Sequence, residues 1–254
     1  MTSFAPVRSV ERTFLVLSEL NRQPISRVQD LERETGLPAP TLVRILETLC
    51  ALGYVQKNGR RAGYTLTEKV RELSSGFHGL PRFIEDAKPV LDELTKTLLW
   101  PAALATLDGE AMVVRVSTIP DSPLSHTHST LQKRLDLLTR AHGQAYLAFC
   151  SAIERDHLFK LLCQTQVSRM QPGELAAHMD PILTRIRYLG YAERDHEIDP
   201  QTTTLAMPVR SGAAVIATMG ITFFRGANPN RTALIEKLDT AVERVENLIG
   251  QAGT

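Results

Sequence analysis

Two groups of side chains in this sequence have the chemistry of metal ligands. His126 and His128 are separated by one residue, and Asp195, His196 and Glu197 follow farther along the chain. Imidazoles and carboxylates are typical zinc ligands, and a metal-dependent hydrolase could use them. However, the Ser-, Thr- and Pro-rich stretch around His126 predicts a loop, and no spacing relates it to His196. Since no nucleophile elbow, Walker loop or dinucleotide fingerprint is present, we expect no catalytic metal, no cofactor and no enzyme, and the hydrolase remains the alternative.

The segment from Pro40 to Leu52 has side chains that could read DNA. Its apolar residues form one helical stripe, made of Leu42, Ile45, Leu46, Leu49 and Leu52. The other positions are candidates for DNA contact, namely Pro40, Thr41, Val43, Arg44 and Thr48. Arg can bond a guanine edge in the major groove through two hydrogen bonds, and Thr can use its hydroxyl or its methyl group. Arg44 is therefore the leading candidate for a base contact.

A charged hairpin is expected directly after this helix. Within residues 54–66, Asn58-Gly59 lies between two stretches that favour β-structure, which predicts a hairpin. The three cations at its tip are Lys57, Arg60 and Arg61. Such a wing would bring these cations to phosphates, which position a protein on DNA without carrying sequence information.

Two earlier helices are needed to position these groups. Residues 10–21 follow Ser9, a good N-cap, and their predicted buried face is Val10, Phe14, Leu15, Leu17 and Leu20. A short second helix should begin with a Ser26–Gln29 capping box and end at Gly36. The third should begin at Pro40, which suits the first helical position. Two helices joined by a four-residue turn containing Gly predict a helix-turn-helix.

Length and composition fit two domains of a globular protein. The 254 residues are 43% hydrophobic and 22% charged, and no apolar run approaches the ~18 residues of a membrane span. The N-terminus lacks the apolar core of a secretory signal, so we expect a cytoplasmic protein without a membrane partner. Cys50, Cys150 and Cys163 form no CxxC pair and predict free thiols. Residues 1–80 carry 11 basic and 8 acidic side chains against 18 and 20 in the remainder, which suits local DNA contacts.

The rest of the chain predicts an antiparallel sheet with segregated helices, an α+β sensor layout. Asp108-Gly109 and Ser211-Gly212 predict hairpins over residues 103–117 and 205–224. Helical patterns cover residues 84–98, 143–150, 152–163, 174–189 and 234–250.

The motifs of the first 80 residues resemble the IclR family of regulators. They are Arg8-Ser9-Val10-Glu11-Arg12, Gly36-Leu37-Pro38, Thr41–Leu49, Leu52-Gly53-Tyr54-Val55, Tyr64-Thr65-Leu66 and Val70–Ser74. Pro40 stands where that family often has Ser or Thr. The resemblance implies a winged helix-turn-helix at 1–66, a linker helix at 67–80 and an effector-binding domain of GAF/PAS-like type at 81–254. It also implies operator binding as a homodimer or homotetramer, with RNA polymerase as a further partner if the protein activates transcription.

The second half carries the resemblance further. Ala141-His142-Gly143 with Tyr146-Leu147-Ala148, and Gly190-Tyr191-Ala192 with Leu205–Val209, resemble the family's pocket-forming stretches. Other stretches, such as Leu99-Trp100-Pro101, are similar to the MhpR-like branch, which implies an aromatic or related organic acid as effector and a catabolic operon as target. The family's usual glycines are replaced by Gln132 and Gln201, which leaves the loop shape and the choice of ligand open.

The resemblance places the effector at Ala141, His142, Arg194, Thr204, Gly220 and Thr222. Gly220 and Thr222 would share one strand face, where a small residue leaves room for a ligand. A carboxylate needs cations or free backbone N–H groups, and these residue types suggest Arg140, Arg194 and the amides near Gly143 at a helix start. The expected function is DNA binding controlled by a small organic acid, and a ligand-independent DNA-binding protein is a second alternative.

Overall fold

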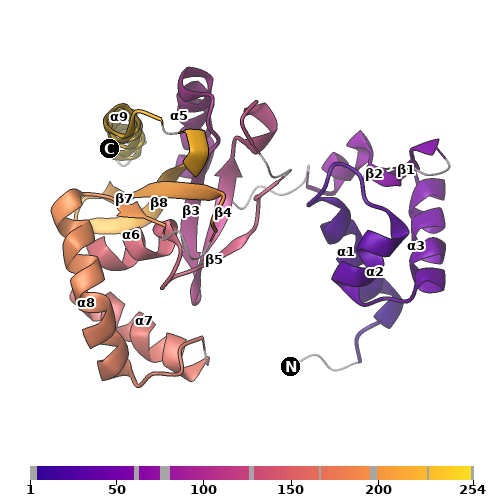
Figure 1. Ribbon diagram of the computed structural model, residues 1–254, viewed down its shortest axis with the longest axis horizontal. Coiled ribbons are helices and arrows are strands. Elements are labelled where there is room, and N and C mark those ends of the chain that lie inside the picture. Colours follow the sequence, from indigo (N-terminus) through magenta and orange to yellow (C-terminus); the bar gives the residue numbers. More distant parts are fainter. Residues whose placement is uncertain are drawn as a thin grey trace. The chain divides into compact units, whose positions relative to one another are not determined.

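The chain folds into two compact units, which the computed structural model describes over residues 5–59, 63–74, 81–125, 129–165, 167–194, 199–227 and 229–252 (Figure 1). Residues 1–80 with 127–129 form the first unit, and residues 81–126 with 130–254 form the second. The segment 67–80, which the sequence assigns to a linker, therefore belongs to the first unit.

Three helices form the first unit around one apolar core. Helix α1 spans Arg8–Leu20, α2 spans Val28–Thr35 and α3 spans Ala39–Ala51. Gly36 ends α2 with a φ of +67°, a left-handed conformation that glycine adopts without a Cβ clash. The core contains Val16, Leu20, Leu31, Leu37, Leu42, Leu46, Leu49, Val55 and Tyr64. The predicted helix-turn-helix is confirmed.

Helix α1 buries a different face from the predicted one. Val16 and Leu20 lie in the core, and the predicted Leu17 is half-buried. The remaining predicted core positions are exposed, namely Val10, Phe14 and Leu15. Because α1 carries apolar residues on more than one side, periodicity alone could not select the stripe that packs against its neighbours.

The two predicted caps of these helices are wrong. Helix α1 begins at Arg8, so Ser9 lies inside it. Ser26 is buried and pairs with Tyr64 through two backbone hydrogen bonds of 2.9 and 3.0 Å, so it does not cap α2. The backbone N–H of Arg27 instead donates to Asp30 Oδ2 at 3.2 Å. The β-bridge satisfies both backbone groups of a buried residue, which a cap at that position would not do.

A hairpin follows α3, but its connection is longer than predicted. Strands β1 (Val55–Lys57) and β2 (Tyr64–Leu66) are antiparallel, and Lys57 pairs with Tyr64. Six residues therefore join the strands, so Asn58-Gly59 is not a two-residue turn. The Asn58 N–H donates to the Gly63 carbonyl at 2.9 Å, and the Asn58 amide donates to Thr65 Oγ1 at 3.0 Å.

The described part of the predicted linker helix is a 3-10 helix, η1 (Glu68–Ser74). Its start is attached to the end of α3: Thr67 Oγ1 donates to the Gly53 carbonyl at 2.6 Å, and Lys69 Nζ donates to the Leu52 carbonyl at 3.1 Å. Lys69 also lies over the Tyr54 ring, 5.1 Å from its centroid. These contacts join the segment to the first unit.

The second unit contains a six-stranded antiparallel sheet. In spatial order the strands are β5 (Arg134–Asp136), β4 (Ala111–Ser117), β3 (Ala102–Asp108), β8 (Ala214–Phe224), β7 (Thr202–Ser211) and β6 (Ala192–Glu193). Both predicted hairpins are present, with their turns one residue later than expected, at 109–110 and 212–213. The short edge strands β5 and β6 were not predicted, because two or three residues carry no periodic signal.

Helices cover both faces of this sheet (Figure 1). One face packs against α5 (Arg82–Leu98) and α9 (Arg231–Ala252). The other packs against α6 (Ala141–Phe149), which in turn contacts α8 (Pro172–Leu189), and α7 (Ala152–Gln164) packs on α8. Short 3-10 turns lie at Ile119–Asp121 (η2) and Arg225–Ala227 (η3). The predicted α+β layout is confirmed, and among the described helices none is long and apolar enough to cross a membrane.

Gln132 keeps a glycine-like backbone although it is not a glycine. Its φ is +61°, a region that costs most side chains roughly 1 kcal/mol or more. The Gln132 N–H donates to the Val114 carbonyl at 2.8 Å, and Gln132 Oε1 accepts from Arg115 Nη1 at 3.0 Å. The loop therefore has the backbone that a glycine would give it, at a position where the sequence left its shape open.

Helix α6 meets the preceding chain at Gly143. A Cβ at this position would lie 2.4 Å from Leu137 Cα and 2.5 Å from the Asp136 carbonyl oxygen, both of which are backbone atoms. Only a glycine lets α6 approach this closely.

We expect Gly143→Ala to destabilise the second unit by about 1–3 kcal/mol, because the added methyl group overpacks a rigid contact. The midpoint of chemical unfolding measures this effect. Gly173→Ala is the matched control, because nothing lies within 4 Å of a Cβ built on Gly173 in α8. It should be neutral or stabilising by up to about 1 kcal/mol, and equal effects of the two variants would contradict this view of the α6 contact.

Candidate nucleic-acid interface and effector site

The outer face of α3 presents the side chains predicted to contact DNA. Pro40, Arg44 and Thr48 are exposed, and Thr41 and Val43 are half-buried. Among the described residues, the Arg44 guanidinium has no hydrogen-bond or ion-pair partner, so its donors are available to a base edge. Thr48 Oγ1 donates to the Arg44 carbonyl at 2.8 Å and keeps its acceptor capacity. Leu52, predicted in the buried stripe, is 54% exposed because α3 ends at Ala51.

The first turn of α3 offers no free backbone N–H at residues 38–41. Pro38 and Pro40 have no N–H, and Pro40 occupies the second helical position instead of the predicted first. The Ala39 N–H donates to Glu32 Oε1 at 3.1 Å, and the Thr41 N–H donates to the Pro38 carbonyl at 2.9 Å. Helix N-termini often bind phosphates through such groups. Contacts from this turn must therefore come from side chains.

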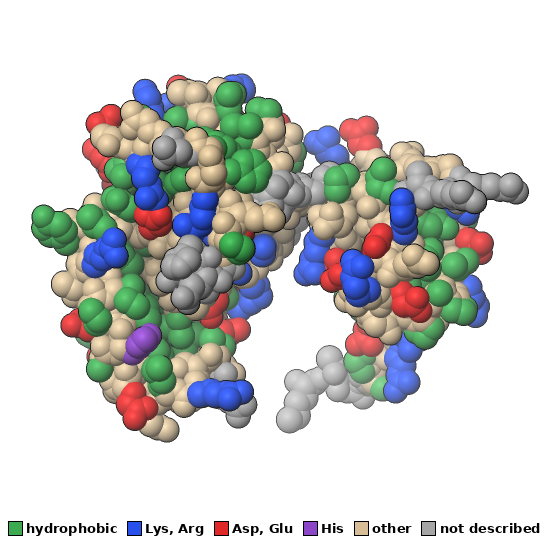
Figure 2. Space-filling model, viewed as in Figure 1, with side chains coloured by type: hydrophobic (Ala, Val, Ile, Leu, Met, Phe, Trp, Pro, Cys, Tyr) green, Lys and Arg blue, Asp and Glu red, His purple; other side chains and the backbone are tan. Residues whose placement is uncertain are grey.

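The wing contributes one described cation to this interface. Lys57 is exposed, and its Nζ lies over the Tyr64 ring, 5.7 Å from the centroid. Arg60 and Arg61 lie outside the described residues. On the face seen in Figure 2, acidic and basic side chains are interspersed over each unit, without a broad surface of one sign. This pattern suits a protein whose DNA contacts are local.

In the second unit, Thr204 and Thr222 lie side by side on the α6 face of the sheet. They are register partners in β7 and β8, and their hydroxyl oxygens are 2.9 Å apart. Gly220 lies two residues before Thr222 and shares this face. Strand alternation therefore placed Gly220 and Thr222 on one face of the strand correctly.

The space beside Gly220 is occupied by His142. A Cβ at Gly220 would lie 2.9 Å from His142 Nε2 and 2.7 Å from the Leu205 carbonyl oxygen. His142 Nδ1 is 2.9 Å from Thr218 Oγ1. The expectation that a small residue here leaves room for a ligand is thus wrong, because the glycine accommodates an imidazole. Burial lowers the pKa of His142 to about 4, the charge of Arg194 lowers it as well, and the hydrogen bond with Thr218 opposes both.

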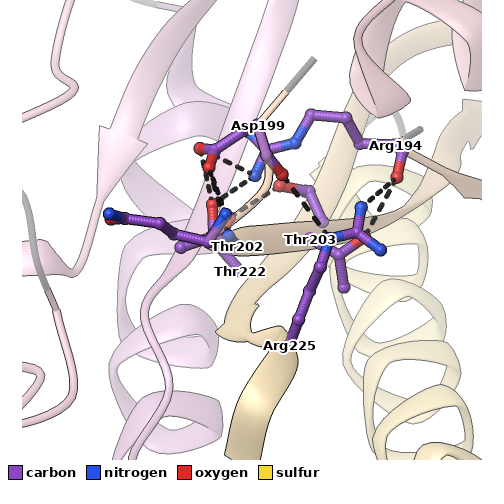
Figure 3. A network of polar contacts seen from close by, with 8 residues as sticks. Arg194, Asp199, Thr202, Thr203, Thr222 and Arg225 are labelled. Carbon is purple, nitrogen blue, oxygen red and sulfur yellow. Dashed lines mark hydrogen bonds and ion pairs between the residues drawn. The ribbon is translucent and has the colours of Figure 1, made fainter. Parts of the chain in front are cut away.

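Arg194 connects the strands at the edge of the sheet (Figure 3). Its Nη2 donates to Thr202 Oγ1 and lies 3.3 Å from Asp199 Oδ2. Its side chain is only 11% exposed, and its Nε is buried without a hydrogen-bond partner in the described structure. Burial lowers the pKa of Arg194, Asp199 opposes this shift, and Arg140 and Arg225 add to it through like charge.

Asp199 and Arg225 complete this network and were not predicted. Asp199 accepts hydrogen bonds from the backbone N–H groups of Gln201 and Thr202 and from Thr202 Oγ1, at 2.8 to 3.1 Å. Burial raises the pKa of Asp199, but these bonds and Arg194 outweigh it and the net shift is downward. Arg225 Nη2 donates to the Arg194 carbonyl at 3.2 Å. The available signal was Asp199 itself, since Asp often accepts from the N–H two residues later, here that of Gln201.

Three further predicted residues lie at the start of α6. Arg140 is the half-buried residue before the helix, Ala141 is buried as its first residue, and Gly143 contacts the 136–137 backbone. The charge of Arg140 is close enough to Arg194 to lower its pKa, and the Arg140 guanidinium has no hydrogen bond to the described residues.

Both candidate metal-ligand groups, His126 with His128 and Asp195 to Glu197, lie outside the described residues. Within the described ranges, no group of three or more His, Cys, Asp or Glu side chains could hold a metal ion. Cys50, Cys150 and Cys163 are free thiols, and burial raises the pKa of Cys150 to about 11.

The buried His142 makes the stability of the second unit depend on pH. Its folded pKa of about 4 lies below the value of 6.5 expected for the unfolded chain. The free energy of unfolding therefore does not depend on this histidine above pH 6.5, and it falls by about 3 kcal/mol as the pH decreases toward 4. Urea unfolding at several pH values should show this slope in wild type and in His157→Gln, whose histidine is exposed on α7, but not in His142→Gln. A His142 imidazole that titrates near pH 6.5 by NMR would contradict this assignment.

Comparisons with known proteins agree with both units. Residues 9–59 match the model of the IclR helix-turn-helix domain, and residues 82–247 match that of the bacterial transcriptional regulator IclR C-terminal domain. The chain is similar to the HTH-type transcriptional regulator KdgR of Dickeya chrysanthemi, with 26% identity over 250 residues, which cover 96% of this chain and 80% of that protein.

Solved structures share the fold. The IclR of Thermotoga maritima has a TM-score of 0.65 and 19% identity, covering 96% of this chain and 99% of that one. An IclR homolog of Microbacterium hydrocarbonoxydans complexed with 4-hydroxybenzoate has a TM-score of 0.60 and 19% identity, and the match covers 95% of this chain and 98% of that one. Because the two family models together span the helix-turn-helix and most of the sheet-containing unit, this chain belongs to the IclR family of bacterial DNA-binding transcriptional regulators.

Proposed function

We propose that this IclR-type regulator controls a catabolic operon in response to a small organic acid. The main support for DNA binding by the first unit is the exposed Arg44 guanidinium. It lies on the outer face of α3 and has no partner among the described residues. Thr41, Val43 and Thr48 would complete the base-reading surface, and Pro40 would pack against the backbone. Lys57, Arg60 and Arg61 would contact phosphates. In this proposal residues 1–66 bind DNA, residues 67–80 link the two domains, and residues 81–254 bind the effector.

The acid is proposed from the charge of the second unit. Arg194 is nearly buried and carries an unpartnered Nε, with the positive charges of Arg140 and Arg225 close enough to lower its pKa. A carboxylate would relieve this accumulation of like charge. The hydroxyls of Thr204 and Thr222 would complete the polar part of the site. Its floor would be formed by the residues that pack α6 on the sheet, namely Ala141, His142, Gly143 and Gly220. We propose an aromatic acid, as in the MhpR-like branch, and the 4-hydroxybenzoate bound by the M. hydrocarbonoxydans homolog supports this choice.

The regulator would act in the cytoplasm as a homodimer or homotetramer, since two copies can place two recognition helices on successive half-sites. Effector binding would change the spacing of these helices or, for an activator, the contact with RNA polymerase.

For the DNA-binding half, we expect Arg44→Ala to weaken operator binding by about 1–3 kcal/mol and to relax discrimination at one base pair. Lys57→Ala should weaken binding to all sequences alike and reduce the slope of log affinity against log salt by about 1. Arg33→Ala is a charge-matched control, because Arg33 is exposed on α2 and already paired with Glu34. Gel-shift and footprinting assays on the upstream DNA measure these effects. If Arg44→Ala left affinity and base preference unchanged, the assignment of Arg44 would be wrong.

For the sensing half, we expect benzoate or 4-hydroxybenzoate to raise the melting temperature, because a ligand that binds only the folded state stabilises it, by about 2.7 kcal/mol at 100 times its Kd. Gluconate tests whether the threonine hydroxyls favour a hydroxylated acid. A protein that binds its operator but whose melting temperature no acid shifts would be a ligand-independent DNA-binding protein.

A further inference from the structure

A cavity of about 450 Å³ lies between the second half of α8, strand β6 and the turn after β8. Its apolar side is formed by three side chains of α8, namely Ile182, Ile186 and Leu189. Three guanidinium groups also line it, those of Arg185, Arg194 and Arg225. Its volume falls within the range of about 300–1,000 Å³ that is typical of small-molecule sites.

The described charges of this cavity are mainly positive. Its one described carboxylate, Glu193, forms an ion pair with Arg231. Arg185 is exposed and has no hydrogen-bond or ion-pair partner among the described side chains. Arg194 uses its Nη2 for Thr202 and Asp199, which leaves the buried Nε unsatisfied. An unsatisfied buried donor is unfavourable, more so when it is charged, so a negative charge in the cavity would be stabilising.

Arg225 contributes charge without offering all of its donors. Its Nη2 donates to the Arg194 carbonyl at 3.2 Å, and its Nε is 3.5 Å from the Asp199 carbonyl. These bonds fix Arg225 beside Arg194, where its like charge lowers the Arg194 pKa. Arg194 and Arg225 therefore favour an anion in the cavity through their positive charge, and Arg185 offers donors that no described side chain uses.

On the sheet face that carries Gly220, the polar side chains are already engaged. His142 occupies the position beside Gly220, and the Thr204 and Thr222 hydroxyls bond to one another. His142 is neutral near pH 7 because burial lowers its pKa to about 4, so it supplies no positive charge. At the α8 cavity, by contrast, an unpartnered guanidinium lies beside open volume and an apolar wall.

We infer that the α8 cavity binds the acid group of a small carboxylate ligand with an apolar body. The carboxylate accepts hydrogen bonds from Arg185 and is attracted by the positive charges of Arg194 and Arg225. The apolar body packs on Ile182, Ile186 and Leu189. This inference rests on the proposed function, because the ligand is taken to be the effector. It assigns an effector contact to Arg185 and an electrostatic role to Arg225, which neither the sequence motifs nor the comparisons identify.

The first test is Arg185→Gln in the full-length protein, titrated by calorimetry with benzoate, 4-hydroxybenzoate and gluconate. Arg185 is exposed and unpartnered within the described structure, so the variant should fold. We expect its affinity for the bound acid to fall by roughly ten- to a hundredfold, the range for a lost charge-assisted hydrogen bond. The matched control is Arg187→Gln, which removes the same charge from the same helix outside the cavity. It should bind the acid like wild type.

The second variant is Leu189→Asp, which places a carboxylate at a cavity residue that is 40% exposed. Like-charge repulsion should abolish acid binding while operator binding without ligand remains at the wild-type level. Unchanged acid affinity in both Arg185→Gln and Leu189→Asp overturns the cavity assignment. So does the absence of binding of all three acids at millimolar concentration to a wild-type protein that binds its operator. If the wild-type protein bound no operator DNA, the proposed regulatory function would be refuted instead.

Discussion

The close approach of α6 to the sheet and to the chain before it is the constraint on which the second unit depends. Gly143 brings the helix within contact of the 136–137 backbone, and Gly220 accommodates the His142 imidazole from the same helix. Two glycines, one on each element, therefore remove the side-chain volume that would separate the layers. Because His142 satisfies Nδ1 with Thr218 and stays neutral, this contact buries a polar ring without burying a charge. The position of α6 also determines where Arg140 and α8 lie.

Cationic groups accumulate at the β6 edge of this sheet, close enough to His142 for the charge of Arg194 to lower its pKa. Arg194 is nearly buried, Arg225 is tied to backbone carbonyls beside it, and Asp199 is the described carboxylate that pairs with Arg194. Burying a guanidinium next to another one is unfavourable unless anions compensate. The hydrogen bonds to Asp199 hold its pKa low and keep it ionised, but one carboxylate does not match the arginines around it. A site of this kind gains stability from an anionic ligand, which is the property that a sensor needs.

The sequence predicted the elements with strong local signals and missed those that depend on long-range pairing. Gly36 marks the turn of the helix-turn-helix, and the 108–109 and 211–212 dipeptides locate both large hairpins to within one residue. Ser26 was misassigned because its partner, Tyr64, is 38 residues away and creates a β-bridge that no local pattern reveals. The exposed face of α1 was misassigned because its helix has two apolar sides. For the site, strand alternation correctly grouped Gly220 and Thr222, whereas Thr204 came from the family resemblance. His142 occupies the space beside Gly220 only because of the way α6 packs on the sheet. No local sequence pattern indicates that packing.

The backbone of Gln132 has a consequence for how this sequence can change over time. Its φ of +61° is a glycine conformation, and the Arg115 guanidinium that holds its Oε1 also bonds to Thr106 and Asp108. The cost of the backbone and the gain from the side chain are of similar size, about 1 kcal/mol each. A replacement of Arg115 would thus be tolerated more easily in a chain that has glycine at 132. The two positions are expected to show epistasis: the order in which substitutions arise would decide which ones survive.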